Sequence, residues 1–540
     1  MPRSYDYIIV GAGSAGCVLA NRLSADRNTS VLLIESGPAD SSPLIAMPRG
    51  IGKLLVAGNP HVWDYQAVPR EGLAPELWLK GRTLGGSSSV NGTVYVRGAP
   101  ADYDHWEALG CAGWGWHDVG PHFVALEDHE LGASQWRGVG GPLKVSVHPA
   151  GDPLCEAVLD AAVEAGTPRT EDMNHVQSVA AGGMGYQPVT TYRGKRYSAA
   201  RAFLAPVRSR SNLDVLTETD VLRIEFQGRR AGTLVVEDRA GTRRIGVAGE
   251  LILSAGAIES PKLLQLSGVG PAEVLRAHGI PVLLDVPGVG RNLREHRYLA
   301  VQYRVTGGSL NSRLTGRGLL RSILSYTLRS KGALTHSAHE VGGFVKTRPQ
   351  LARPDAQIGV GLYSMSVSGK TVNIDPHPGM TIGGYFMRPE SQGWVEIRSP
   401  DPAVRPYINA NHLAAEIDVR SAISLFRWIR RLSAQPALAS WLISETTPGP
   451  DVQSDAEIID AFLRYGSTAF HVCGTLRMGS DAGAVLDPQL RLRGLENLRV
   501  ADTSIMPTLV SGNTNAPAMV IGLRAAEIIG QARAGAARAA

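Results

Sequence analysis

The chain begins with an ordered succession of apolar and polar segments. Tyr7–Val10 is a run of β-forming residues, and a glycine-rich segment follows it directly. Apolar residues then recur at helical spacing over residues 17–25, and residues 31–34 form another apolar run, which is followed by Glu35. Since short apolar runs bounded by glycine turns are typical of buried strands, the pattern predicts a strand, a turn, a helix and a second strand.

Two later segments show related patterns. Residues 251–271 read as a strand, a turn of small residues and a helix that ends at a Ser-Gly pair. Residues 497–529 end in an amphipathic pattern in which Pro517 suits the first helical turn. The apolar positions that recur there near helical spacing are Met519, Leu523, Ala526 and Ile529. The sequence therefore predicts a strand–turn–helix unit near its middle and a long helix near residue 520.

The spacing of the glycines in the first turn indicates what this turn binds. Gly11, Gly13 and Gly16 form a GxGxxG motif, in which the first glycine permits the tight turn, the second lets a pyrophosphate approach the backbone and the third packs helix against strand. The helix N-terminus then faces the phosphates, and Glu35 is placed to accept hydrogen bonds from a ribose diol. The motif predicts a dinucleotide site rather than a mere glycine turn. FAD and NAD stay open, whereas an acid at position 35 disfavours NADP.

Composition limits the class of protein. At 540 residues, two domains or one elaborated large domain are expected, and 44% hydrophobic with 19% charged residues is typical of a globular protein. The net charge of +5 is too small over this length to indicate a nucleic-acid partner. The four cysteines form no CxxC pair, so we expect neither a disulfide framework nor a zinc site.

Location is predicted from the absence of targeting patterns. The N-terminus passes almost at once into a strand, so we expect no signal peptide. No apolar run approaches the roughly 20 residues that span a bilayer, which predicts a protein that is either cytoplasmic or peripheral on the inner face of a membrane. Residues 316–332 and 424–432 are basic and amphipathic. Each would suit a membrane surface or the protein's own core, and core packing is the commoner cause of such a pattern.

Five motifs, in this order, carry a resemblance over essentially the full length. They are the GxGxxG unit, GRTLGGSSSVNGTVYVRGAPADYDHW (81–106), the 251–271 segment, and HVCGTLRMG (471–479) followed by 497–529. The chain resembles the glucose–methanol–choline (GMC) oxidoreductases, with the strongest likeness to bacterial alcohol and choline dehydrogenases. The resemblance implies an α/β fold (α+β overall), with a doubly wound, Rossmann-like FAD-binding domain and a substrate domain with an antiparallel sheet and helices. We expect the FAD-binding domain at 1–155, 195–300 and 465–540, and the substrate domain at 156–194 and 301–464.

The resemblance also implies a catalytic pair. In relatives, the histidine of an H-x-x-G-T segment faces the flavin N5, and His471 fits that pattern. The second position falls in SGNTNAPAM, where its counterpart is Asn515. Alcohol oxidation needs the hydroxyl proton to leave; a neutral imidazole can accept it, and an amide can donate a hydrogen bond to the same oxygen. Whether His471 is a true base or mainly a hydrogen-bond donor stays open.

Further residues are expected at the cofactor. TLGGSSSVNG would bring glycine backbone and polar side chains to FAD, rather than form a serine-rich surface loop. The predicted FAD-binding residues are Gly11, Gly13, Ser14, Ala15, Gly16, Glu35, Trp63, Gly85, Gly86, Ser89, Asn91, Gly92, Val94, Val221, Ala255, Ala501, Asp502, Asn513 and Ala516. Some relatives attach FAD covalently through a histidine near this motif. Since residues 83–97 contain neither histidine nor cysteine, we predict non-covalent FAD.

The substrate end is less well specified. Glu340 and Phe470 are the predicted pocket residues: Glu340 would attract a cation such as choline, while Phe470 favours an uncharged primary alcohol. His336 and His339 lie near Glu340 in the sequence, but no matching ligand cluster accompanies them. GMC chemistry needs no metal, so we predict none.

The predicted function is FAD-dependent oxidation of an aliphatic or aromatic primary alcohol to the aldehyde. Hydride passes to flavin N5, and the electrons then pass to a quinone-type acceptor or to oxygen. A lyase of the same fold, in which FAD is bound but not reduced as in hydroxynitrile lyases, is the alternative. A light-driven decarboxylase would use a cysteine and an arginine, for which Cys473 and Arg477 are the candidates, although a lone cysteine is more often a buried small hydrophobe. The sequence does not identify the alcohol, the acceptor or the oligomeric state.

Overall fold

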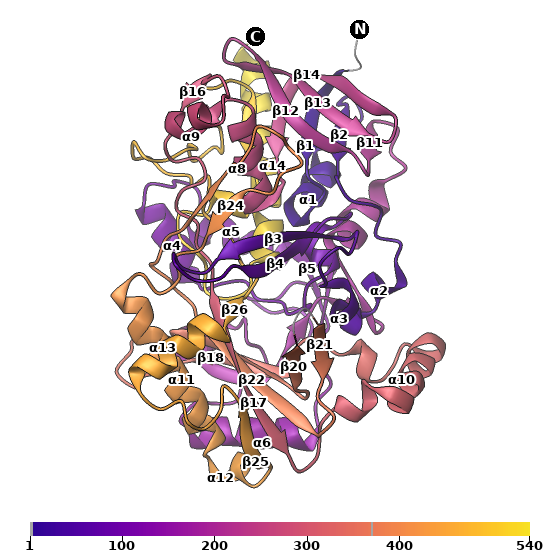
Figure 1. The fold of residues 1–540 in the computed structure, drawn as a ribbon. Coiled ribbons are helices and arrows are strands. Elements are labelled where there is room, and N and C mark those ends of the chain that lie inside the picture. Colours follow the sequence, from indigo (N-terminus) through magenta and orange to yellow (C-terminus); the bar gives the residue numbers. More distant parts are fainter. Residues whose placement is uncertain (1–3, 369–370, 540) are drawn as a thin grey trace.

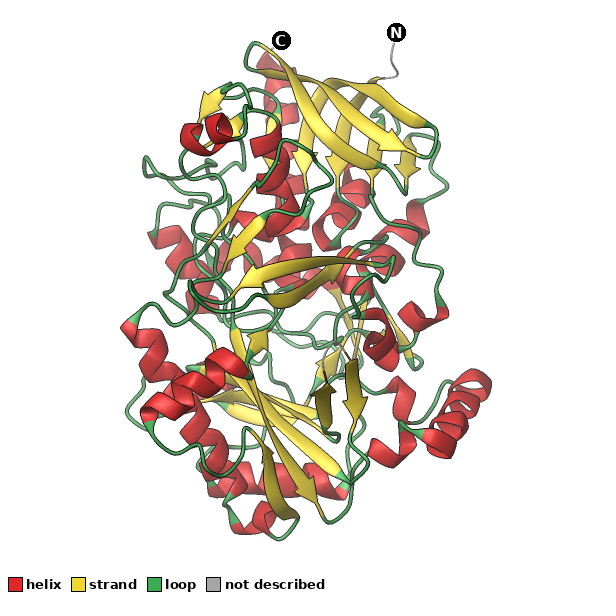
Figure 2. Ribbon diagram, in the orientation of Figure 1, coloured by secondary structure: helices red, strands yellow, loops and turns green. Residues whose placement is uncertain are grey.

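Two sheets lie at opposite ends of the molecule, with helices around them and a smaller sheet in between (Figures 1 and 2). The structure is a computed structural model that describes residues 4–368 and 371–539. The N- and C-terminal ends both lie at the end that carries the first sheet (Figure 1). In the described part of the chain, no helix combines the length and apolarity needed to cross a bilayer.

The first sheet is built on a parallel core. Its strand order is β11 (Leu213–Leu216), β2 (Val31–Ile34), β1 (Ser4–Val10), β14 (Gly241–Leu253), β13 (Arg230–Asp238) and β12 (Asp220–Gln227), and β27 (Leu498–Val500) also pairs with β14. The pairs β11–β2, β2–β1, β1–β14 and β14–β27 are parallel, whereas β13 and β12 add antiparallel strands at one edge. The residues of β2 are all buried, as expected for a parallel strand covered on both faces. The predicted strand–turn–helix–strand unit is confirmed.

Two helices from opposite ends of the sequence pack together beside this sheet. Helix α1 (Ser14–Leu23) contacts α14 (Asn515–Ala539), which also contacts α5 (Trp116–Leu126). A Cβ atom on Gly522 of α14 would lie 2.8 Å from the carbonyl oxygen of Ala15, so glycine permits this close crossing. The helix predicted after residue 251 is α8 (Gly256–Leu266). The other helices of the first 300 residues are α2 (Pro43–Ala46), α3 (Ile51–Leu54), α4 (Pro100–Ala108), α6 (Pro153–Glu164), α7 (Val176–Ala181) and α9 (Ala272–Ala277).

The second sheet is antiparallel, as predicted. Its order is β25 (Leu442–Thr447), β17 (Arg297–Val305), β22 (Gly379–Phe386), β19 (Ala356–Gly361), β18 (Val341–Val345) and β7 (Gly183–Tyr186), with β26 (Ser467–Thr468) pairing with β17. Helix α11 (Glu416–Ser433) packs against β22 and contacts α6, α12 (Pro436–Ala439) and α13 (Asp455–Arg464). The second apolar core lies between these helices and the sheet.

One face of this sheet carries small residues where three of its strands lie side by side. Ala300 of β17 lies opposite Gly383 of β22, which lies opposite Gly359 of β19. A Cβ on Gly383 would lie 1.7 Å from the Tyr298 hydroxyl, and one on Gly359 would lie 2.8 Å from the His339 ring. The glycines therefore leave room for these two side chains above the sheet, where both line a cavity.

Five smaller sheets complete the part of the chain that the structure describes, and the first of them joins segments that are distant in sequence. They comprise β23 (Trp394–Glu396), β24 (Tyr407–Asn409), β3 (Val62–Val68) and β4 (Glu76–Gly81); β5 (Glu127–His129), β6 (Leu143–Val147) and β8 (Pro188–Val189); β9 (Thr191–Tyr192) with β10 (Lys195–Arg196); β15 (Val269–Gly270) with β16 (Leu284–Asp285); and β20 (Met365–Ser368) with β21 (Thr371–Ile374).

The predicted domain division remains a prediction, although the sheets largely follow it. The strands of the first sheet all come from segments assigned to the FAD-binding domain. In the second sheet, β26 and the first residues of β17 lie across the predicted boundaries. The pairing of β24 with β3 also joins segments that were assigned to different domains.

Candidate active site

A cavity of about 1490 Å³ lies between the two large sheets, and both contribute to its walls. Residues near the ends of β1 and β2 line one part, and residues of β17 and β22 line another. The volume exceeds the roughly 300–1,000 Å³ of a pocket for one drug-sized ligand. It suits a dinucleotide together with a small substrate.

The glycine motif and Glu35 fit the dinucleotide part of the cavity. The Glu35 carboxylate accepts hydrogen bonds from the backbone amides of Ala12 at 3.0 Å and Gly37 at 2.9 Å. Burial raises the pKa of Glu35 to about 7, against these hydrogen bonds, which favour its ionised form. A Cβ on Gly13 would meet no atom closer than 3.9 Å, so its backbone is open on that side. A carboxylate held in this way keeps lone pairs for a ribose diol.

The TLGGSSSVNG segment folds back onto this motif. Gly85 donates its backbone amide to the Ala12 carbonyl at 2.8 Å, and a Cβ on Gly86 would lie 2.7 Å from the Gly13 Cα. The Asn91 side-chain oxygen accepts a hydrogen bond from Arg196 at 2.6 Å. Because that arginine is buried and also bonds backbone carbonyls, it fixes the Asn91 amide at the cavity wall.

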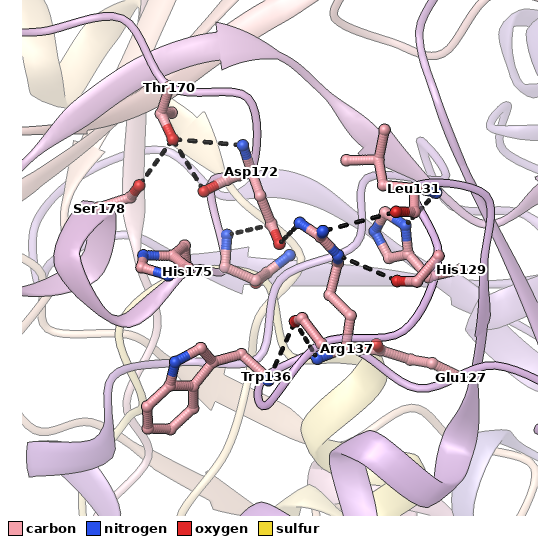
Figure 3. A network of polar contacts seen from close by, with 12 residues as sticks. Glu127, His129, Leu131, Trp136, Arg137, Thr170, Asp172, His175 and Ser178 are labelled. Carbon is pink, nitrogen blue, oxygen red and sulfur yellow. Dashed lines mark hydrogen bonds and ion pairs between the residues drawn. The ribbon is translucent and has the colours of Figure 1, made fainter.

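A network of polar side chains outside the cavity holds the backbone next to this part of the cavity wall. Asn174 donates to the Tyr95 carbonyl at 3.1 Å and accepts from the Arg97 amide at 3.0 Å, so it clamps the backbone that continues the wall. Asp172 accepts the Asn174 backbone amide at 2.8 Å and forms an ion pair with Arg137 at 3.1 Å, within the network of Figure 3. These residues hold the wall in position without lining the cavity.

At the other part of the cavity, hydrogen bonds fix the backbone around His471. Its amide donates to Glu295 at 2.9 Å, and Lys80 donates to the Phe470 carbonyl at 2.8 Å. The Thr468 hydroxyl donates to Glu295 and accepts the Phe470 amide. Phe470 has a φ of 65°, a left-handed conformation that is uncommon for a non-glycine residue. The surrounding bonds maintain this conformation and thereby aim His471 into the cavity.

The imidazole of His471 has a partner at each nitrogen. Its Nδ1 lies 3.0 Å from Nδ1 of His296, and its Nε2 lies 3.1 Å from the Asn513 amide nitrogen. The ring of Tyr385 stacks on His296 with centroids 4.4 Å apart. Burial, together with the nearby His296 and Lys80, lowers the pKa of His471 well below its ordinary value. His471 is therefore neutral at pH 7.

The contacts of His296 determine the tautomer of His471. Nε2 of His296 lies 2.8 Å from the Met387 carbonyl, which can only accept, so this nitrogen carries a proton. Burial lowers the pKa of His296 to about 3, so the ring is neutral and its Nδ1 has a lone pair. The proton between the two rings must then belong to Nδ1 of His471. Nε2 of His471 is left as a hydrogen-bond acceptor facing the cavity side.

A second series of hydrogen bonds orients the Asn513 amide so that it fits this tautomer of His471. The Tyr385 hydroxyl donates to the Gln357 side-chain oxygen at 2.7 Å, and the Gln357 amide donates to the Asn513 side-chain oxygen at 2.9 Å. The Asn513 NH₂ group is therefore the end that faces His471. Each hydrogen bond from Tyr385 through Gln357 and Asn513 to His471 therefore joins one donor to one acceptor. This arrangement requires a lone pair on Nε2 of His471, as in the neutral imidazole.

The prediction that paired His471 with Asn515 is corrected by this geometry. Asn513, which was predicted only to bind the cofactor, makes the contact to His471. Asn515 is the first residue of α14, and its side-chain oxygen accepts a hydrogen bond from Ser14 at 2.9 Å. It joins the N-terminal turns of α14 and α1 at the dinucleotide part of the cavity.

Most other predicted FAD-binding residues line the cavity. Those that do are Gly11, Gly13, Ser14, Ala15, Glu35, Trp63, Gly86, Asn91, Gly92, Val94, Val221, Ala255, Asp502 and Asn513. Those that do not are Gly16, Gly85, Ser89, Ala501 and Ala516. The assignment of these five to FAD stays a prediction; in the structure the Ser89 hydroxyl donates to the Leu84 carbonyl, and Gly16 packs against the Gly11 carbonyl.

Glu340 does not lie where it was predicted. It is fully buried, does not line the cavity, and forms a short ion pair with Arg49. Burial opposes ionisation, but the charge of Arg49 and a hydrogen bond from His336 outweigh it and lower the pKa of Glu340 to about 2. His148, His336 and Glu340 bring potential ligand atoms within 4.8 Å of one another, but Arg49 already supplies the positive charge there. Phe470 does line the cavity and is 40% exposed.

Cys473 and Arg477 offer no reactive pair. Cys473 is fully buried, and burial raises the pKa of its thiol. Arg477 forms a two-point ion pair with Asp481, at 2.6 and 2.7 Å, and does not line the cavity. The geometry therefore gives no support to a decarboxylase that uses these two residues.

His296, Gln357 and Tyr385 were not predicted as site residues. His296 stands in the segment GVGRNLREH, where a histidine directly before β17 was a usable signal. Gln357 and Tyr385 are side chains of ordinary-looking strands, β19 and β22, that lie opposite each other. Only the pairing of these strands brings them together.

Comparison with known proteins identifies relatives over nearly the whole chain. Family models described as GMC oxidoreductase match residues 5–298 and 389–522. The chain is 40% identical to the alcohol dehydrogenase (acceptor) of Pseudomonas putida over 97% of this chain and 95% of the relative. It is 41% identical to the mitochondrial choline dehydrogenase of Homo sapiens over 97% of this chain and 89% of the relative.

Solved structures agree with the fold. Pyridoxine 4-oxidase from Mesorbium loti superposes with a TM-score of 0.86 at 32% identity, covering 97% of this chain and 99% of that one. A formate oxidase structure gives a TM-score of 0.87 at 27% identity, with 98% of each chain covered. These likenesses confirm the fold that the sequence motifs implied.

Proposed function

We propose that this chain, which belongs to the GMC oxidoreductase family and is an FAD-dependent enzyme acting on CH–OH donors, oxidises an uncharged primary alcohol, aliphatic or aromatic, to the aldehyde. The observation that carries the proposal is the pairing of His471 with Asn513 at the cavity. When bound, FAD supplies the hydride acceptor at its N5 atom.

The cofactor would be held without a covalent bond. Backbone of the glycine motif, Glu35 and the segment 86–94 are the groups that fit it best, because they combine open backbone with fixed polar side chains. The segment 86–94 contains no histidine or cysteine that could attach a flavin. Acid precipitation of the purified enzyme should therefore release its flavin into the supernatant, and flavin that stays with the protein would contradict the non-covalent mode.

His471 and Asn513 would handle the hydroxyl group. An alcohol that enters between them replaces the Asn513 amide as the donor to Nε2 of His471, and its oxygen receives the amide instead. As hydride leaves the carbon, Nε2 accepts the hydroxyl proton, while the amide stabilises negative charge on the oxygen. His296 accepts the Nδ1 proton of His471 in a hydrogen bond and so keeps Nε2 free for this task.

The wall at the substrate end favours an uncharged alcohol. Among the described lining residues from 298 to 385 and from 447 to 472, there are aromatic rings, hydroxyl groups, two histidines (His339 and His471) and one arginine (Arg464), but no carboxylate. Glu340, the nearest candidate counter-ion by sequence, is neutralised by Arg49 and lies outside the cavity lining. A cationic alcohol would therefore find no full negative charge at this wall.

For the electron acceptor, we propose a quinone-type compound in preference to oxygen. The support is the name of a relative that is 40% identical, an alcohol dehydrogenase that uses an acceptor. Oxygen remains the alternative, since relatives at 37% and 39% identity are named oxygen-dependent choline dehydrogenases.

The test is an anaerobic titration of the purified, FAD-loaded enzyme with primary alcohols and choline, followed through the visible flavin band. We expect uncharged alcohols to bleach the band, His471→Ala to abolish bleaching, and His117→Ala, which changes a histidine that does not line the cavity, to leave it intact. Admitting air then distinguishes slow recolouring, expected for a quinone-dependent dehydrogenase, from the rapid recolouring of an oxidase. Preferential bleaching by choline would refute the uncharged substrate. Cleavage of a cyanohydrin with the flavin still oxidised would refute alcohol oxidation altogether.

A further inference from the structure

Helix α10 (Gly316–Arg329) projects from the body of the protein (Figure 1), and several of its large apolar side chains are exposed. Leu320, Leu324 and Leu328 are 68%, 59% and 73% exposed, and Ile323 is 40% exposed. Because the leucines are four residues apart on a helix of about 3.6 residues per turn, they form a single stripe. The opposite side of the helix is the attached one, where Ser322 and Tyr326 are buried.

Basic side chains border this stripe. Arg317 and Arg321 lie on the same flank as Leu324 and Leu328, and Arg329 and Lys331 follow at the helix end. No aspartate or glutamate occurs from residue 306 to 339. Among the described residues, no ion pair engages any of these four cations. We call Leu320, Ile323, Leu324 and Leu328, with Arg317, Arg321 and Arg329, the α10 surface.

A neighbouring hairpin extends the basic character. The turn between β9 and β10 packs on the end of α10, where a Cβ on Gly194 would lie 2.2 Å from the Ser330 carbonyl oxygen. This contact places Tyr192, which is 41% exposed, and the exposed cations Arg193 and Lys195 beside the helix end.

The second basic amphipathic segment of the sequence behaves differently. It lies in α11, whose apolar residues, among them Leu425, Trp428 and Ile429, are buried against the second sheet. The core therefore uses the apolar face of α11, whereas the protein's own fold leaves that of α10 uncovered.

We propose that the α10 surface docks the enzyme on an anionic phospholipid bilayer. An amphipathic helix of this kind lies in the plane of the membrane surface, with its apolar side chains at the acyl boundary and its cations among the headgroups. Two observations favour lipid over a second copy of this chain: the segment 306–339 contains no carboxylate, so two copies of the α10 surface would repel each other, and the exposed leucines form a stripe along one projecting helix rather than a groove. An anionic bilayer supplies both the apolar layer and the negative charge that this surface lacks.

The proposal is tested with FAD-loaded enzyme sedimented with vesicles of phosphatidylcholine mixed with phosphatidylglycerol, and with vesicles of phosphatidylcholine alone. We expect binding to the anionic vesicles that weakens as salt is added. Arg317→Gln, Arg321→Gln and Arg329→Gln together should weaken it roughly 100-fold, since each cation near such a surface contributes about fivefold. The matched control, with the same change of net charge, replaces three exposed arginines elsewhere by glutamine: Arg27, Arg70 and Arg398.

The apolar stripe has its own variants. Leu324→Glu with Leu328→Glu should weaken binding at least roughly tenfold, whereas Leu283→Glu with Ile443→Glu, at exposed apolar positions on other elements, should not. All four native cysteines are buried, so a polarity-sensitive dye on Leu324→Cys reports on this helix. Its emission should shift to the blue with anionic vesicles, and that of a dye on Ile443→Cys should not.

Three results would overturn the proposal. One is the absence of binding to anionic vesicles; another is binding that the α10 variants reduce no more than their controls do. The third is a dimer in sedimentation velocity that Leu324→Glu with Leu328→Glu abolishes, in an enzyme that does not bind vesicles. That last result would assign the α10 surface to a second copy of the chain.

Discussion

Replacing Asn513 and Asn515 in turn distinguishes two side chains of the same type that lie two positions apart. Asn513 faces Nε2 of His471 at 3.1 Å, whereas Asn515 accepts from Ser14. Asn513→Ala removes the amide that would donate to the reacting oxygen. By comparison with the loss of one donor to a developing oxyanion, kcat should fall about 10²–10³-fold. Asn515→Ala removes only a hydrogen bond between helix ends, so at saturating FAD kcat should stay within about a factor of three.

Stability effects need to be separated from this loss. Asn513→Ala leaves the buried Gln357 amide without its acceptor, which costs about 1–3 kcal/mol of unfolding free energy. Asn515→Ala loses one hydrogen bond, about 0.5–1.5 kcal/mol. If both variants remain fully folded under the assay conditions, a large difference in kcat between them cannot come from partial unfolding. Denaturant titration of both proteins checks this.

The assay is anaerobic stopped-flow reduction of the bound flavin by the best alcohol. Asn513→Asp adds a sharper readout, because a carboxylate beside His471 would raise the imidazole pKa and protonate the base at higher pH. The acid limb of the reduction rate should therefore move upward in that variant and not in Asn515→Asp. Equal losses in Asn513→Ala and Asn515→Ala, or a larger loss in the latter with FAD saturating, would refute the assignment.

Three further predictions follow from the geometry. Because burial holds the pKa of His471 well below 6.5, the neutral base persists through mild acid, and kcat/KM should fall only as pH drops through that lowered value. Glu340→Gln should lower the unfolding free energy by about 3–5 kcal/mol, since it leaves the buried Arg49 charge unpaired, while KM for an uncharged alcohol stays unchanged in steady-state assays. Gly86→Ala places a Cβ 2.7 Å from the Gly13 Cα; a strain of about 1–3 kcal/mol should raise the FAD dissociation constant roughly 5–150-fold, measured by flavin fluorescence on dilution.

Each of these has a contrary outcome. An acid limb at or above pH 6.5 would mean that His471 is not the buried neutral base. If Glu340→Gln raised KM for cationic alcohols alone, Glu340 would act as a substrate-binding residue after all. For the glycine, Gly52→Ala is the control, because its added Cβ meets no atom within 4 Å; equal flavin loss in both variants would remove the argument from close packing.

Local sequence patterns predicted the parts of the fold that are local in the chain. The β1–α1–β2 unit follows from glycine spacing and apolar periodicity within some thirty residues, and His471 follows from a short motif. Local sequence patterns could not assign separate roles to Asn513 and Asn515. A motif that contains Asn-Thr-Asn does not indicate which of the two side-chain amides turns toward His471. The backbone of the turn before α14 decides that, and it depends on packing.

The other errors have a common physical cause. Glu340 was assigned to the substrate pocket because the sequence does not reveal that Arg49, 291 residues away in the chain, is its ion-pair partner. Gln357 and Tyr385 gain their roles from the pairing of β19 with β22. The helices α10 and α11 carry similar amphipathic patterns yet differ in burial, since periodicity reveals an apolar face but not what covers it.

The order in which the first sheet is completed has a consequence for biosynthesis. β27 supplies the last parallel neighbour of β14, along Leu251–Leu253, and α14 covers α1. Both are translated long after β1, β2 and α1, and at about 5–20 residues per second the delay is on the order of half a minute or more. Until then, the nascent chain exposes an unpaired apolar strand edge, and the cavity lacks the lining residues that the C-terminal segment contributes, among them Asp502 and Asn515. Its yield in a cell should therefore depend on chaperones that shield this edge until FAD can be captured.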